Sequence, residues 1–245
     1  MPIQTRGHSP QAYARTAGVL YLIIIVFGIS AELVLRSSLI VPGDATATAG
    51  NILGSQMLFR LGFAADSVVF ISDVALAILL YVLLAPVDRT LSMVAAAFRL
   101  TQAAVLGFNL LHHHAALLVL TGPGYTSGLT PDQLDALALL MLDLHGYGYD
   151  LGLLFFGASC LVLGYLIARS GYFPRVLGYL VIAAGFAYLI GSYTLFLLPD
   201  YAAAIEPIYI VSIVSELSLC LWLLIKGVNV DVWHRMSSVA AGQSE

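Results

Sequence analysis

Long apolar stretches alternate with short polar segments along the chain, and six of the stretches are long enough to cross a bilayer. A membrane helix needs about 20 predominantly apolar residues. The predicted spans run from about Ala17 to Leu35, Arg60 to Leu84, Leu91 to Leu120, Leu134 to Arg169, Val176 to Leu198 and Pro207 to Ile225. The pattern therefore predicts an all-α fold, a polytopic membrane protein built as a bundle of six transmembrane helices.

Ionisable side chains interrupt these apolar stretches deep within the predicted spans. The clearest case is the run from Asp143 to Asp150 in the fourth span, which also contains His145. Charges at this depth are costly and normally face the interior of a bundle or a wet cavity. We therefore expect a polar cavity in the outer-to-middle part of the bundle. The residues expected to line it are Asp66, Asp73, Arg99, Asn109, His113, His145, Asp150 and Glu216.

The second and third spans are joined by a short turn, so their acidic and basic residues should meet. Asp66 and Asp73 share a face of the second span, and Arg99 lies on the third. At 1.5 Å per residue, Asp73 lies near the middle of the membrane. Two interpretations remain open: a buried ion pair that fixes helix packing, or part of a proton or ion relay.

Glycines on the spans predict close contacts between helices. Gly18 and Gly28 fall on one stripe of the first span, and such stripes let another helix approach closely. Gly146 and Gly148 in the fourth span permit either a kink or a close helix contact.

The composition agrees with a membrane protein. Of the 245 residues, 60% are hydrophobic and only 10% are charged, whereas soluble domains carry about 25% charged residues. The lipid bilayer is therefore the first expected partner. The net charge is −4 and the chain has no basic run, so we expect no nucleic-acid partner. Cys160 and Cys220 lie in apolar stretches and are typical of small buried hydrophobic residues.

Basic residues predict the orientation of the chain. Positive charge favours the cytoplasmic side, and seven basic residues fall on or near one side against Arg36 and Arg60 on the other. The seven are Arg6, Arg15, Arg89, Arg169, Arg175, Lys226 and Arg235. We therefore expect both termini in the cytoplasm, a multi-pass location in the cell inner membrane, a lead at residues 1–16, a transmembrane domain at 17–226 and a polar tail at 227–245.

The histidines raise the question of a metal site. His113 and His145 enter the membrane from the same side, and acids on neighbouring spans can add oxygen ligands. However, the chain has no HExxH pattern, and the consecutive residues His112, His113 and His114 must point three ways on a helix. We therefore expect no metal, no other cofactor and no catalytic residue. An intramembrane metal-dependent hydrolase acting on a lipid stays as the alternative.

Several segments resemble a bacterial membrane family catalogued as domain of unknown function 4386. They are Ala14-Arg15-Thr16-Ala17-Gly18 with Tyr21-Leu22, Phe98-Arg99, the run from Gly164-Tyr165-Leu166 through Arg169-Ser170-Gly171-Tyr172-Phe173-Pro174-Arg175-Val176-Leu177-Gly178, and Glu216-Leu217 with Leu221 to Val228. The resemblance covers residues 12 to 228. It implies a multi-span inner-membrane protein and brings no activity, substrate or catalytic residue with it.

The leading hypothesis is a non-enzymatic role: binding, sensing or passage of a small molecule, proton or lipid. It rests on ionisable residues inside the spans without a recognisable catalytic pattern. Besides the hydrolase, a structural or partner-binding membrane subunit is a further alternative, in which the glycine stripe of the first span faces another chain. Homo-oligomerisation is compatible with each of these roles.

Overall fold

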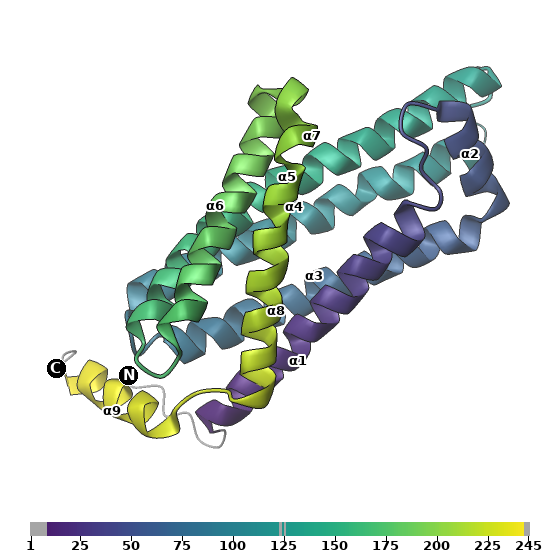
Figure 1. Cartoon of the computed structure of the whole chain (residues 1–245). Helices are drawn as coiled ribbons and strands as arrows, with labels where there is room; N and C mark the ends of the chain where they lie inside the picture. Colours follow the sequence, from purple (N-terminus) through teal and green to yellow (C-terminus); the bar gives the residue numbers. More distant parts are fainter. Residues whose placement is uncertain (1–8, 123, 125, 243–245) are drawn as a thin grey trace. The chain divides into compact units, whose positions relative to one another are not determined.

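The computed structural model of the chain describes residues 9–122, 124 and 126–242, and its regular structure in these ranges is entirely helical (Figure 1). The predicted lead at residues 1–16, with Arg6, and the end of the predicted tail therefore lie partly outside the described residues. The elements in order are α1 (Pro10–Ile29), a π-helix (Ser30–Arg36), α2 (Ala45–Gly54), α3 (Gln56–Leu84), α4 (Arg89–Thr121), α5 (Pro131–Arg169), α6 (Arg175–Leu197), a 3-10 turn (Pro199–Tyr201), α7 (Ala202–Ile205), a second 3-10 turn (Glu206–Ile208), α8 (Tyr209–Ile225) and α9 (Val230–Gly242).

The six predicted spans are confirmed. Among the described residues, six helical segments are long and apolar enough to cross a membrane, namely Pro10–Val34, Gln56–Leu84, Arg89–Thr121, Pro131–Arg169, Arg175–Leu197 and Pro199–Ile225. Each has at least 23 residues, which exceeds the length that the hydrocarbon core requires. The chain is thus an all-α multi-pass membrane protein.

Polar residues at the helix starts set several boundaries. Thr130 and Gln133 form a reciprocal capping box at α5, in which each backbone N–H donates to the other residue's side chain. The carboxylates of Asp44 and Asp88 accept backbone N–H groups in the first turns of α2 and α4 at 2.9 Å. Ser9 accepts the N–H of Ala12, so α1 begins well before the apolar run that the sequence pattern marked.

The polar tail expected at residues 227–245 contains helix α9, which the apolar pattern did not predict. Asn229 caps its start by accepting the backbone N–H of Val232. Trp233 Nε1 donates to the carbonyl of Leu83 at 2.9 Å, and the Tyr172 hydroxyl donates to the same carbonyl at 2.7 Å. Burial raises the pKa of the Tyr172 hydroxyl. These bonds tie α9 and the α5–α6 turn to the end of α3.

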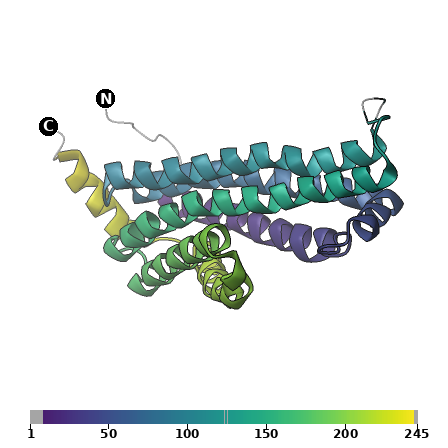
Figure 2. The same ribbon diagram turned by 90° about the horizontal axis from the view of Figure 1, so that it is seen from above.

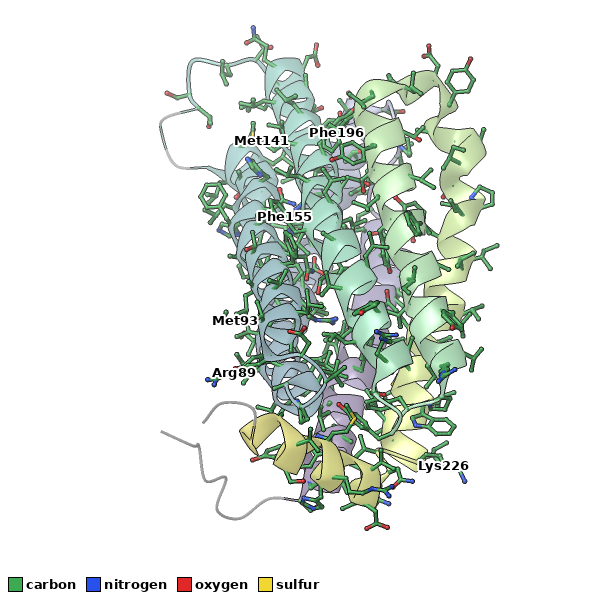
Figure 3. All side chains as sticks on the ribbon, turned by 90° about the vertical axis from the view of Figure 1, so that its left-hand side faces the viewer. Arg89, Met93, Met141, Phe155, Phe196 and Lys226 are labelled. Carbon is green, nitrogen blue, oxygen red and sulfur yellow. The ribbon has the colours of Figure 1, made fainter. Side chains whose placement is uncertain are left out.

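The chain divides into two compact units. Unit 1 comprises Met1–Leu22, Ser72–Gln102 and Gly152–Glu245, and unit 2 comprises Ile23–Ile71 and Ala103–Leu151. In unit 1, α6 and α8 lie side by side (Figures 1 and 2). Arg89 and Lys226 lie at the end of unit 1 where α9 is found (Figure 3).

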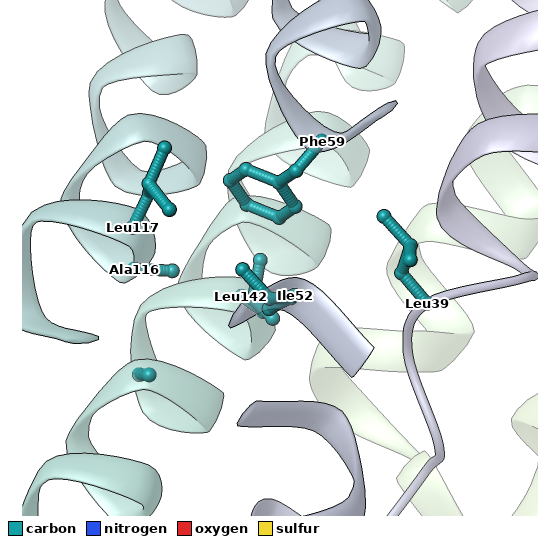
Figure 4. Packing of buried hydrophobic residues seen from close by; sticks show 7 residues of the cluster. Leu39, Ile52, Phe59, Ala116, Leu117 and Leu142 are labelled. Atoms are coloured by element: carbon teal, nitrogen blue, oxygen red, sulfur yellow. The ribbon is translucent and has the colours of Figure 1, made fainter. Parts of the chain in front are cut away.

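Unit 2 has an apolar core that α2 helps to close. Ile52 of α2 packs with Phe59, Leu117 and Leu142, which come from α3, α4 and α5, and with Leu39 from the preceding loop (Figure 4). Val69, Phe70, Leu106 and Leu110 form a second cluster between α3 and α4. Long apolar side chains thus hold the halves of α3, α4 and α5 that belong to unit 2.

Glycines let the helices of unit 1 approach one another closely. A Cβ on Gly164 would lie 2.6 Å from the carbonyl oxygen of Gly178, and one on Gly18 would lie 2.8 Å from the backbone nitrogen of Leu224. The predicted close contact of the first span is therefore made with α8 at Gly18. At Gly28 an added Cβ would meet none of the described atoms within 4 Å.

We expect opposite effects from Gly18→Ala and Gly28→Ala, although both lie on the same stripe. Gly18→Ala forces α1 away from the α8 backbone and should destabilise the protein by about 1–3 kcal/mol. Gly28→Ala adds only helix propensity and should be neutral or stabilise by up to about 1 kcal/mol. Thermal unfolding in detergent micelles measures both. Equal midpoints for the two variants would contradict the close contact at Gly18.

Candidate functional site

An ion pair lies inside unit 1, between α3 and α4. Arg99 donates to Asp73 Oδ1 from Nε at 2.8 Å and from Nη2 at 2.5 Å. Both side chains are almost completely buried. Asp73 Oδ2 and Arg99 Nη1 have no hydrogen-bond partner among the described residues. The pair that the short α3–α4 turn predicted is therefore formed, with one polar atom of each partner unused.

Two aromatic rings hold the Arg99 guanidinium from the sides. Its central carbon lies 5.4 Å from the ring centroid of Tyr21 and 4.9 Å from that of Phe156. Both distances are within the range of cation–π attraction. The rings come from α1 and α5, and the sequence pattern did not identify them as neighbours of Arg99.

Glu216 lies near the middle of α8 and is half-buried. Its Oε1 accepts a hydrogen bond from the hydroxyl of Tyr188 on α6. The ring of Tyr188 also packs against Phe156 and Tyr209, with centroid distances of 5.0 and 5.9 Å. Glu216 further interacts electrostatically with Arg99 and Asp73. The acid of α8 is thus part of the polar interior of unit 1.

A small cavity adjoins Arg99. Its volume is about 10 Å³, which is just enough for one water molecule. Two serines with satisfied hydroxyls contribute to its wall: Ser92 donates to the carbonyl of Tyr81 at 2.9 Å, and Ser159 donates to that of Ala95 at 2.8 Å. The remaining wall is mainly alanine and leucine. The cavity therefore joins a charged group to neutral polar ones.

Unit 2 contains a second buried arginine. Arg36 ends the π-helix, and its Nη1 donates to Asp66 on α3, while its Nε donates to Glu32 at 2.8 Å. Burial lowers the pKa of Arg36, but the carboxylates of Asp66 and Glu32 more than offset this and raise it. The arginine thus stays charged between a buried acid and an exposed one.

Asn109 connects α4 to α5 in unit 2. Its Nδ2 donates to the carbonyl of His145 at 2.7 Å and lies 3.2 Å from His145 Nδ1. Its Oδ1 lies 3.0 Å from His112 Nδ1. Gly148 makes the contact possible, because a Cβ there would lie 2.0 Å from Asn109 Oδ1. The glycine therefore serves a close helix contact, one of the two uses that the sequence left open.

The three consecutive histidines contact three different groups, as helical geometry predicts. The His113 ring stacks on Phe59 at a centroid distance of 4.0 Å and meets the edge of His145 at 5.5 Å. His114 lies against Phe63, while His112 bonds to Asn109. Within the described part of the chain, His113 Nδ1 and His145 Nε2 lack a hydrogen-bond partner.

The predicted cavity residues fall in both units. Asp73, Arg99 and Glu216 belong to unit 1, whereas Asp66, Asn109, His113, His145 and Asp150 belong to unit 2. Asp150 is half-buried on α5. Asp66 is bonded to Arg36, a partner that the sequence pattern placed at the outer surface. A single cavity lined by all eight residues stays a prediction.

The positions of the side chains that could bind a metal bear on the alternative of a metal-dependent hydrolase. Among residues 9–122, 124 and 126–242, no group of three or more His, Cys, Asp or Glu side chains is placed to hold a metal ion. Zinc in a catalytic site takes three protein ligands and leaves one position for water. His113 and His145 adjoin each other, but two histidines fall short of this set, so no feature of the described residues favours the hydrolase.

Removing Asp66 should destabilise the protein far more than removing Glu32. Asp66→Ala leaves Arg36 without its buried partner, which costs about 3–5 kcal/mol. Glu32→Ala removes a carboxylate whose side chain is 63% exposed, so its loss should cost at most about 1 kcal/mol. Unfolding in detergent micelles measures the difference. Similar losses for both variants would mean that the Arg36–Asp66 bond contributes little.

Gly148→Ala and Gly146→Ala form a matched pair on α5. The new methyl group at 148 displaces Asn109 and breaks its bonds to His145, so we expect a loss of about 1–3 kcal/mol. At 146 an added Cβ meets none of the described atoms within 4 Å, and the gain in helix propensity should stabilise slightly. Thermal unfolding separates them, and an unaffected Gly148→Ala variant would contradict the Asn109 contact.

Comparison with known proteins identifies relatives without an assigned activity. The model of the family described as "Domain of unknown function (DUF4386)" matches residues 16–227. An "Uncharacterized protein" from Archaeoglobus fulgidus is 31% identical over 159 residues, which cover 65% of this chain and 79% of the relative. No solved structure matches the chain. Because the family model matches nearly all of the six-helix region, the chain belongs to the family of domain of unknown function 4386.

Proposed function

We propose that the chain is a non-enzymatic, multi-pass protein of the bacterial inner membrane that binds and passes protons through the polar interior of unit 1. The observation that carries the proposal is the buried Asp73–Arg99 pair beside a cavity of about 10 Å³. Each partner keeps one polar atom unbonded among the described residues. Asp73 is the member of the pair that can take up a proton, because an arginine keeps its charge in proteins, and Arg99 Nη1 can donate a hydrogen bond to a water in the adjoining cavity.

The size of the cavity favours a proton over the other candidate ligands. Pockets for small molecules usually measure hundreds of Å³, whereas the cavity at Arg99 holds about one water. The hollow beside Arg36 and His113 in unit 2 has no room for a water. A proton needs only a chain of donors and acceptors.

The position of the pair also supports this role. Arg99 lies ten residues after the start of α4 at Arg89, or about 15 Å along the helix. This distance is about half of the hydrocarbon thickness. An ionisable group at this depth is a functional candidate by default, since it is costly to keep there.

Basic residues support an orientation with both termini in the cytoplasm. Arg89, Arg169, Arg175 and Lys226 lie at helix ends of unit 1 that adjoin the α3–α4 and α5–α6 turns and α9. Arg36, counted from sequence on the opposite side, is buried in ion pairs instead. The predicted outer side therefore has fewer exposed positive charges, which agrees with the rule that loops rich in Lys and Arg stay inside.

A structural role for the pair is the second candidate. It is favoured by the rings of Tyr21 and Phe156, which fix the Arg99 guanidinium and so stabilise helix packing. In this case the pair would hold α3 and α4 together without exchanging a proton.

Proton flux across lipid vesicles tests the proposal. The purified chain is placed in vesicles that contain a pH-sensitive dye, and a potassium gradient with valinomycin supplies the driving force. Wild-type vesicles should acidify faster than protein-free ones. Asp73→Asn should lower the flux by about a hundredfold, the lower end of what a positioned proton-transfer group contributes.

Two further variants separate function from folding. Asp73→Asn leaves Arg99 unpaired, whereas Asp73→Asn with Arg99→Gln removes both charges and should fold while still lacking flux. Asp143→Asn, which changes an exposed acid of α5, should conduct like wild type. Flux in the folded double variant equal to that of wild type would leave the structural role as the better account.

A further inference from the structure

The interior of unit 1 contains two acids and one arginine. Asp73 takes both of the hydrogen bonds that Arg99 donates to an acid. Glu216 is bonded instead to the neutral hydroxyl of Tyr188. Within the described part of the chain, the ion pairs of Arg99 reach no other carboxylate than Asp73. Glu216 is thus the acid without its own positive partner.

The helices around Glu216 bring several titratable groups to it, but little positive charge. The titratable or charged groups that interact with it are Tyr188 from α6, Tyr21 from α1, Cys160 from α5, Arg99 from α4 and Asp73 from α3. Only Arg99 is positive. If both acids were ionised, this group would have one excess negative charge within the membrane, which is strongly unfavourable. One proton on Glu216 removes the excess.

The arginine of unit 2 differs from Arg99 in how its second acid is solvated. Arg36 also has two acids, but its second acid, Glu32, has a side chain that is 63% exposed at the end of the first span. Water or headgroups can therefore solvate the extra charge. Glu216 lies seven residues after Tyr209 and nine before Ile225, so no such solvation is within reach.

Glu216 lies where the buried and exposed faces of α8 meet. Ser212, Ser215, Leu219 and Cys220 are at most 2% exposed, whereas Ile213 is 53% and Leu217 is 38% exposed. Side chains three and four residues apart share a helix face. One edge of the Glu216 side chain therefore adjoins the apolar face that lipid covers, and the other adjoins the interior.

Two buried hydroxyls continue the polar face of α8 toward its start. The Oγ atoms of Ser212 and Ser215 have no hydrogen-bond partner among the residues that the structure describes. A hydroxyl both donates and accepts, so it can pass on a proton. Ser212 lies one turn before Glu216, and because neither hydroxyl is bonded to the acid, water between them would complete a route from the end of α8 at Tyr209.

We infer that Glu216 is the proton carrier of unit 1, which binds its proton as a neutral acid accessible from lipid while Asp73, in the resting state, is ionised and paired with Arg99. The inference rests on the proposed proton function and assigns one carboxyl to it. The chemical class of the ligand is a single proton, supplied through Ser212 and Ser215 and stabilised by the surrounding charge balance rather than by a metal.

Labelling with dicyclohexylcarbodiimide tests the inference directly, because this apolar reagent reacts with protonated carboxyls that lipid can reach. The acid's proton moves to a reagent nitrogen and its oxygen bonds to the central carbon. Transfer of the acyl group to nitrogen then leaves a stable acylurea with the summed mass of both reactants. Peptide mass mapping of the full chain in lipid vesicles locates the adduct.

We expect an adduct on Glu216 that decreases about tenfold per pH unit above its midpoint, as a single protonation requires. Glu216→Gln should remove the adduct and lower proton flux, while Asp143→Asn should change neither. Glu32 serves as an internal control for a water-soluble carbodiimide because it is exposed. An adduct on Asp73 instead of Glu216, or labelling of Glu216 that is independent of pH, would overturn the inference.

Flux measurements on the same vesicles keep the two claims distinguishable. If Glu216→Gln conducts protons like wild type, Glu216 is not the carrier, although passage through unit 1 stands. If wild-type vesicles conduct no protons while Glu216 is labelled with the expected pH dependence, passage is refuted and Glu216 stands as a proton-binding site.

Discussion

A charge inside a membrane must be matched by an opposite charge or be neutralised, and both units are built around this constraint. Each unit contains a group of one buried arginine and two acids. Arg36 is bonded to both Asp66 and Glu32, whereas Arg99 is bonded to Asp73 and interacts with Glu216 only through its charge. Both units therefore have one positive group for two acids, but the surroundings of Glu216 and Glu32 differ. At Glu32 solvent can compensate the surplus, whereas at Glu216 a proton must do so. The proposed proton chemistry therefore belongs to unit 1.

Small residues make these polar interiors possible. Helices in lipid gain little from the hydrophobic effect between them and associate through close packing and hydrogen bonds. Gly18 brings α1 against α8, and Gly148 admits the amide of Asn109 between α4 and α5. The space that a side chain would fill is occupied by the backbone of α8 at Gly18 and by the Asn109 amide at Gly148. The polar groups are thereby satisfied by neighbouring helices rather than by water.

The spans could be predicted from sequence because length and apolar content alone decide whether a helix crosses a membrane. The Asp73–Arg99 pair could also be predicted from the sequence, since a short turn fixes the alignment of two neighbouring helices. The partner of Asp66 could not be predicted, because Arg36 ends a π-helix, in which the usual 3.6-residue spacing no longer gives the face. The rings beside Arg99 escaped prediction since aromatic residues are common on every span. Helix α9 was missed because its pattern is polar, and its docking depends on the Trp233–Leu83 bond between distant segments.

The π-helix at Ser30–Arg36 has a consequence for how insertions and deletions act on this chain. Its wider turns are marked by the bond from the Ser37 N–H to the Glu32 carbonyl, five residues back. Loss of one residue here would restore ordinary α-helical winding with the faces nearly kept, whereas α-helical winding of all seven residues would rotate every following side chain by about 100° about the axis. Arg36 would then turn away from Asp66 with its chemical identity unchanged. The spacing of the segment is therefore as essential to this ion pair as the two charges themselves.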